Sequence, residues 1–171
     1  MRILILNYTG KEENWGCQAT SRNLVDLLKG QFANIEYIDI ETNSTKYRSF
    51  LNKIRLKIIN IFINNVKIFT YVFKFTHTKE HQNIKKIKNC DILILNGEGS
   101  LHSWNKEVSK FLHYLAYAKI INKKVFIVNH SLQFDNKQTH KFLKNIYLYS
   151  LKNYFREGIS YETAKSIGVK S

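Results

Sequence analysis

The sequence predicts an α/β domain of the doubly wound type, built on a mostly parallel sheet. Short apolar runs of strand length alternate with longer segments of helical period, which is the pattern of successive βαβ units. Polar or glycine-containing segments follow four of these runs, as expected where parallel strands end at a ligand-binding edge. A chain of 171 residues fits a single domain whose core is stable without disulfides.

The first part of the series predicts two strands and one helix. The apolar run at 3–6 is the first strand, and the run at 35–40 is the second. Between them, residues 19–29 place their apolar side chains on one side of a helix, and Gly30 stands at the position of a C-cap.

The segment 46–79 is expected to be a basic apolar helical insertion within the domain. Apolar residues occur on most turns from Lys46 to Phe75, and no acidic residue lies between Glu41 and Glu80. One helix or two would fit, and strand character in its second half stays open. Its charges exclude a membrane-spanning helix. It either covers the sheet, contacts an anionic membrane as a basic amphipathic surface, or packs on a second lobe or second copy in a homo-oligomer.

The alternation of strands and helices returns after residue 90. A continuous apolar run at 91–95 indicates a strand covered on both faces, and a glycine turn at 96–100 follows it. The remaining predicted elements are helices at 108–121, 137–151 and 160–167, strands at 125–129 and 154–156, and a capping glycine at 168.

Composition points to a cytoplasmic protein. Cys17 and Cys90 lie far apart without CxxC spacing or neighbouring histidine pairs, so we expect a reducing compartment and no metal. The first ten residues do not fit a signal peptide. The net charge of +14 favours anionic ligands, although bias toward Lys, Asn and Ile without proline explains part of it. No zinc-finger, basic-zipper or RNP pattern occurs, so specific nucleic-acid binding is not expected.

Four segments follow predicted strands and should open onto one edge of the sheet. They are residues 8–20, 96–102, 129–134 and 156–161. Together they supply amides, hydroxyls, glycines, histidines, a carboxylate and an arginine, which suit a sugar or phosphate. The turn at 96–100 has neither GxGxxG spacing nor a phosphate-loop ending, so it is either a structural turn or an anion site.

Four single residues of this edge are candidates to weigh, and two of them, His130 and Arg156, each allow two interpretations. His130 follows a buried strand and is either a general acid or base or a partner of a neighbouring loop. His102 is the better candidate among the other histidines because it adjoins the glycine turn. Arg156 ends a strand and either holds a phosphate or carboxylate or forms a buried salt bridge. Nothing in the sequence activates Cys17 as a nucleophile.

Taken in order, these segments resemble the polysaccharide pyruvyl transferase family. The similar stretches are Asn14-Trp15-Gly16-Cys17-Gln18-Ala19, the strand and turn from Asp91 to Leu101, Val128 to Gln133, and Phe155-Arg156-Glu157 with Ser160 and the ending Ile167-Gly168-Val169. The four stretches occur in the family's order and are spread over nearly the whole chain. The resemblance implies a Rossmann-like N-terminal lobe of a two-lobed fold similar to glycosyltransferase type B.

The resemblance also implies a reaction. Members of that family transfer a pyruvyl group from phosphoenolpyruvate to sugar hydroxyls of a cell-surface polysaccharide such as a capsule or exopolysaccharide, and form a ketal. The acceptor would be a sugar or lipid-linked glycan at the inner face of the membrane, with no cofactor. Glu98 and His130 are the candidates for proton transfer. The candidates for substrate binding are Asn14, Gly16, Asn96, Gly97, Gly99, Ser100, His102, Asn129, Ser131, Gln133, Arg156 and Glu157.

The chain departs from the family pattern in two places. Glu98 stands where the family more often has glycine, and Cys17-Gln18 replaces a usual acidic residue. Beyond Val169 we expect a second lobe that carries much of the donor site, so these residues alone should be weak or inactive in catalysis. The alternatives are a non-catalytic domain that binds a nucleotide or sugar phosphate, and a peripheral membrane protein of glycan synthesis.

Overall fold

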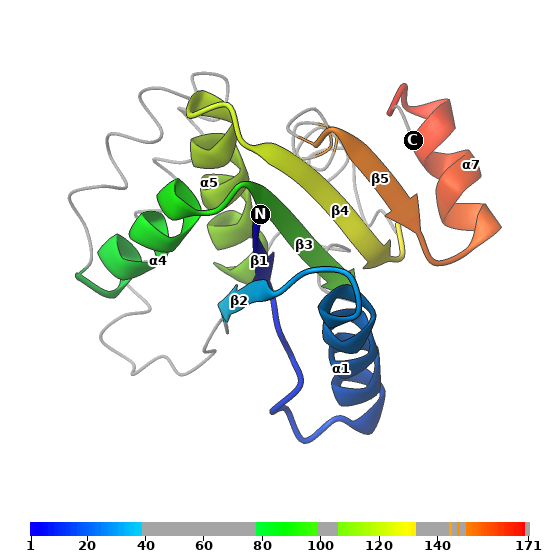
Figure 1. Cartoon of the computed structure of the whole chain (residues 1–171). Helices are drawn as coiled ribbons and strands as arrows, with labels where there is room; N and C mark the ends of the chain where they lie inside the picture. The colour runs from blue at the N-terminus through cyan, green and yellow to red at the C-terminus, as the bar shows by residue number, and fades with distance from the viewer. Residues whose placement is uncertain (39–77, 99–105, 133–143, 145–146, 148–149, 170–171) are drawn as a thin grey trace, which may run out of the picture.

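A computed structural model describes residues 1–38, 78–98, 106–132, 144, 147 and 150–169. Five parallel strands form one sheet in the order β2-β1-β3-β4-β5 (Figure 1). The strands are β1 (Arg2–Leu6), β2 (Asn34–Ile38), β3 (Ile92–Glu98), β4 (Lys124–His130) and β5 (Lys152–Phe155). The α/β fold with a doubly wound parallel sheet is therefore confirmed. Strand β2 lies on one side of β1, and β3, β4 and β5 follow on the other side. The position between β1 and β3 is therefore the switch point, where such sheets bind ligands.

Helices cover both faces of the sheet. The described helices are α1 (Trp15–Lys29), α4 (Thr78–Asn89), α5 (Lys106–Ile120) and α7 (Gly158–Ser166). Leu4, Leu6 and Leu95 point to the face covered by α4 and α5 and pack in one cluster with Ile87 and Phe111.

The opposite face carries a smaller cluster beneath α1. Ile3, Ile5 and Ile94 point to this face and pack with Val25 of the helix. Adjacent residues of β1 and β3 thus serve opposite clusters, which explains why these strands are continuous apolar runs.

Helix ends follow ordinary capping rules. Asn14 caps α1 by accepting a hydrogen bond from the Cys17 N–H at 3.2 Å. Gly30 is the C-cap of α1, in right-handed conformation with φ of −63°. Gly168 has φ of +76°, and the Val169 N–H donates to the Ala164 carbonyl, which completes a Schellman ending of α7. The two predicted glycine stops are therefore confirmed.

Several predicted boundaries are wrong. Helix α1 begins at Trp15 instead of residue 19, because the Asn14 cap starts it four residues earlier. Strand β3 continues through Asn96 and Gly97 to Glu98, so the predicted turn at 96–100 is strand in its first three residues. Its ladder with β4 continues to the Glu98–His130 pair, so pairing with β4 carries the strand past the glycine.

The last elements also shift. Strand β5 covers Lys152–Phe155, so Arg156 lies just beyond it. Helix α7 starts at Gly158 after Glu157, so Ser160 is within the first turn and is not its cap. The sequence analysis missed α4, which has only two apolar residues among twelve.

Other predictions fall outside the described residues. These are the bulk of the 46–79 insertion, the predicted helix between 137 and 143, and Gly99, Ser100, His102 and Gln133 of the candidate site. Among the helices that the structure does describe, none has the length and apolar character to cross a membrane.

Candidate functional site

Polar side chains converge where β1, β3 and β4 end. Asn7 follows β1, Asn96 and Glu98 close β3, and Asn129 lies at the end of β4. In Figure 1 the arrowheads of β3 and β4 lie next to α1, which contributes Thr20 and Ser21 to the same group. The site occupies the β1/β3 switch point, where parallel sheets leave room for a ligand.

A chain of asparagine amides links the three strand ends. The Asn129 side chain donates to the Asn96 side-chain oxygen at 2.9 Å. The Asn7 side chain donates to the Asn96 backbone carbonyl at 2.8 Å. Asn96 is fully buried, and its own amide donates to Ser21 Oγ and to Glu98 Oε1, both at 2.9 Å. The amides therefore fix the relative positions of the three ends.

Glu98 is the centre of this network. Its Oε1 lies 2.7 Å from Thr9 Oγ1, 2.9 Å from Thr20 Oγ1 and 3.2 Å from Ser21 Oγ, in addition to the Asn96 amide. Only 5% of the residue is exposed. Four donors on one oxygen hold a buried carboxylate in place and compensate for its lost hydration.

The backbone at these strand ends is strained. Asn7, Glu98 and Asn129 all have positive φ, at 61°, 41° and 53°. Asparagine tolerates this left-handed region, but glutamate rarely adopts it. Three such residues on adjacent strands turn their side chains toward one place, and strain of this kind clusters at functional sites.

Cys17 borders the network from the first turn of α1. Burial raises the pKa of its thiol, and the hydrogen bond to Glu98 and the charges of Glu98 and Glu12 raise it further, while the Arg156 charge opposes them. The thiol therefore stays protonated near neutral pH, consistent with the prediction that it is not an activated nucleophile. Asn14 and Gly16 lie in the exposed entry to this helix.

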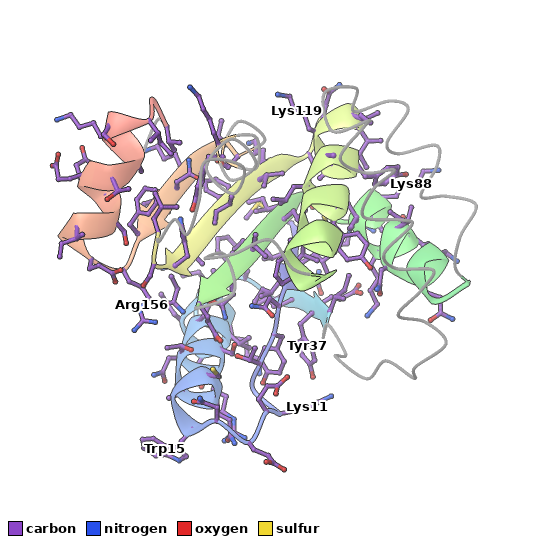
Figure 2. All side chains as sticks on the ribbon, turned by 180° about the vertical axis from the view of Figure 1, so that it is seen from behind. Lys11, Trp15, Tyr37, Lys88, Lys119 and Arg156 are labelled. Atoms are coloured by element: carbon purple, nitrogen blue, oxygen red, sulfur yellow. The ribbon has the colours of Figure 1, made fainter. Side chains whose placement is uncertain are left out.

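Arg156 supplies a positive charge on the β4–β5 side of the site. Its side chain is exposed, and its backbone N–H donates to the His130 carbonyl at 3.0 Å. Figure 2 shows the guanidinium beside the end of α1 that adjoins the sheet. The exposure of Arg156 contradicts the buried salt bridge, and the anion contact stays a prediction.

A neighbouring groove of about 460 Å³ runs along β5 to the start of α7. Arg156 and Glu157 line it, together with Tyr154 and Tyr161. Glu157 accepts hydrogen bonds from Ser131 at 3.1 Å and Ser160 at 2.7 Å, and these two contacts hold the pKa of its carboxyl below the usual value. Arg156 thus stands between the groove and the Glu98 network.

His130 lies beneath the site. It is fully buried, and its ring stacks on Tyr147 at 5.3 Å and lies tilted against Phe155 at 4.5 Å between centroids. Neither ring nitrogen has a hydrogen-bond partner among the described residues. Burial lowers the pKa of His130 to about 4, so the ring is neutral at pH 7. The structure places the His130 ring in the core, and a role of this ring in proton transfer stays a prediction.

The structure thus brings together Asn96, Glu98 and Asn129 on one side and Ser131, Arg156 and Glu157 on the other. Sequence reasoning missed Asn7, Thr9, Thr20 and Ser21. Thr9 and Thr20 lie within the predicted 8–20 segment. Their small hydroxyl side chains, after the first strand, were the feature of the sequence that could have indicated them. No cluster of three metal-ligating side chains occurs within the described part of the chain.

The fold and site define an α/β domain with a buried carboxylate and linked amides at its switch point and an exposed arginine beyond β5. A family model described as polysaccharide pyruvyl transferase matches residues 14–171. The match covers most of the chain, so the protein belongs to the polysaccharide pyruvyl transferase family. None of the curated proteins compared with the chain matches it.

Proposed function

We propose that this domain takes part in pyruvyl transfer from phosphoenolpyruvate to a sugar of a cell-surface polysaccharide, such as a capsule or exopolysaccharide. The reaction takes place in the cytoplasm, on a sugar or lipid-linked glycan acceptor, and needs no further cofactor. Membership of the family supports the reaction class.

The reaction requires two proton transfers and an anion site. Two sugar hydroxyls add to C2 of phosphoenolpyruvate, its C3 methylene gains a proton to become methyl, and the C2–O bond to phosphate breaks. The products are a cyclic ketal and inorganic phosphate. Of the two hydroxyl protons, one balances the new methyl group and the other leaves with phosphate. A base near the acceptor and a cation near the donor therefore promote the reaction.

Residues at the switch point fit these needs. Arg156 has the planar guanidinium that binds phosphate or carboxylate with two parallel hydrogen bonds. Glu98 is the carboxylate assigned to accept the proton of the attacking hydroxyl, and its four donors keep it oriented. Asn129 and Ser131 lie between them along the end of β4 and line the space for the sugar. The observation that carries the proposal is that an exposed arginine and a fixed carboxylate lie at the same edge of the sheet, beyond the ends of β5 and β3.

Calorimetric titration of the chain with phosphoenolpyruvate tests the donor site. We expect Arg156→Ala to weaken binding about 10- to 100-fold, because hydrogen bonds to charged groups contribute roughly 1.5–3 kcal/mol. Arg156→Lys should lie between the two, because lysine keeps the charge but loses the planar fork.

The control is Lys165→Ala, which removes the same charge from an exposed position near the end of α7. This variant should bind phosphoenolpyruvate as the unchanged chain does. No binding by the unchanged chain, or an equal loss in both alanine variants, would contradict the proposed donor contact.

A further inference from the structure

The edge of the sheet opposite the candidate site is strongly basic. Four exposed cations lie where strands begin or a helix ends: Arg2 at β1, Lys88 at the end of α4, Lys124 at β4 and Lys152 at β5. In Figure 2, Lys88 and Lys119 lie at the end of the molecule away from Arg156. We call this surface, defined by Arg2, Lys88, Lys124 and Lys152, the amino edge.

The acidic residue beside it is already engaged by positive groups. Asp91 accepts a hydrogen bond from the Arg2 N–H at 2.7 Å. This bond holds the pKa of the Asp91 carboxyl below its usual value, and the charges of Arg2, the N-terminus and Lys123 add to the effect. Asp91 can neutralise only one of the positive charges around it. The amino edge therefore keeps a net positive charge.

Aliphatic side chains are exposed among these cations. Met1 precedes β1, Ile120 ends α5 and Leu151 precedes β5, with 56%, 38% and 63% of their surfaces exposed. The Leu151 N–H donates to the Val125 carbonyl, so this leucine lies next to the start of β4. Cations and exposed aliphatic residues therefore lie together along one edge.

We propose that the amino edge docks on an anionic lipid bilayer. Basic residues near a bilayer are attracted to anionic headgroups, while aliphatic side chains between them enter the boundary of the acyl chains. The surface differs from the 46–79 segment, and it leaves the switch point facing away from the membrane. The inference does not depend on the proposed pyruvyl transfer.

Co-sedimentation of the chain with vesicles tests this docking. Vesicles of phosphatidylcholine with about one third phosphatidylserine should bind the chain, and vesicles of phosphatidylcholine alone should not. Lys124→Ala with Lys152→Ala should weaken binding about 30-fold, from about 1 kcal/mol for each lysine near the surface. Leu151→Ser should weaken it about tenfold through lost apolar burial.

The matched control is Lys11→Glu, which lowers the net charge by the same two units as the double variant. Lys11 lies beyond β1 at the opposite end of the strands, so this variant should bind as the unchanged chain does. Full binding by the double variant would overturn the proposal, as would equal losses in the variant and its control. Tighter binding to oligonucleotides than to anionic vesicles would overturn it in favour of a nucleic-acid surface.

Discussion

Replacing Glu98 by alanine and by glycine separates the contribution of its side chain from the strain in its backbone. Both replacements remove the carboxylate that accepts from Thr9, Thr20, Ser21 and Asn96. Only alanine keeps a Cβ atom in the left-handed backbone at φ of 41°. The difference in unfolding free energy between these variants therefore reports the strain at the end of β3.

The loss of the Glu98 side chain should cost a moderate amount of unfolding free energy, because its hydrogen-bond donors have other acceptors. Thr9 Oγ1 also lies 2.9 Å from the Cys17 carbonyl, Thr20 Oγ1 lies 3.1 Å from the Gly16 carbonyl, and the Asn96 amide also reaches Ser21. Loss of the carboxylate thus leaves few unsatisfied groups, and we expect Glu98→Ala to cost about 3 kcal/mol.

Backbone strain at position 98 should make glycine more stable than alanine there, whereas glycine is usually the less stable of the two. A left-handed backbone costs a residue with a Cβ atom roughly 1–2 kcal/mol, while the greater freedom of glycine in the unfolded chain costs roughly 0.5–1 kcal/mol. Glu98→Gly should therefore be more stable than Glu98→Ala by about 0.5–1 kcal/mol. Urea unfolding followed by circular dichroism measures both values.

Asp26 provides the control because it is an exposed residue within α1. There, glycine should be about 1 kcal/mol less stable than alanine. If glycine is also the less stable replacement at position 98, the backbone there is unstrained and the reasoning is wrong.

Three further predictions concern His130, Cys17 and Asn96. The pKa of His130 is near 6.5 in the unfolded chain and about 4 in the folded chain. The free energy of unfolding should therefore fall by about 3 kcal/mol as the pH falls from 6.5 to 4, because the unfolded chain binds the proton first. Urea unfolding at pH 7 and 4 should show a smaller loss for His130→Leu, and equal losses would contradict the burial. The Cys17 thiol should react with a disulfide reagent at pH 7.5 more slowly than free cysteine, and faster in Glu98→Gln; an unchanged rate would exclude the Glu98 contact. Asn96→Ala should cost about 3 kcal/mol because it removes the buried link between the strand ends, and a cost below about 1 kcal/mol would show that the amide chain carries little stability.

The parallel sheet could be predicted because its central strands are short, continuous apolar runs. Ile92 to Leu95 read as a buried strand from composition alone, and the structure places them between β1 and β4. Helix α4 could not be predicted in the same way. Its apolar residues Ile84 and Ile87 are too few for a clear helical period, and packing on α5 and β1 stabilises it instead.

The site was predicted in outline but not in its connections. Order along the chain placed Asn96, Asn129 and Arg156 at one edge, since the carboxyl ends of parallel strands meet there. The extension of β3 to Glu98 could not be anticipated, because two glycines in the sequence favour a turn and the strand continues through pairing with β4. For the same reason the hydroxyls of Thr9, Thr20 and Ser21 were not connected to Glu98.

The site is tested most directly by a nitrogen-15 NMR titration of the chain with phosphoenolpyruvate. We predict saturable shifts of the side-chain amides of Asn96 and Asn129 and of the Arg156 Nε–H, with loss of the amide shifts in Arg156→Ala. These groups report the two sides of the candidate site. Shifts confined to backbone amides of the amino edge, around Lys124 and Lys152, would contradict the account by showing that phosphoenolpyruvate only meets a basic surface.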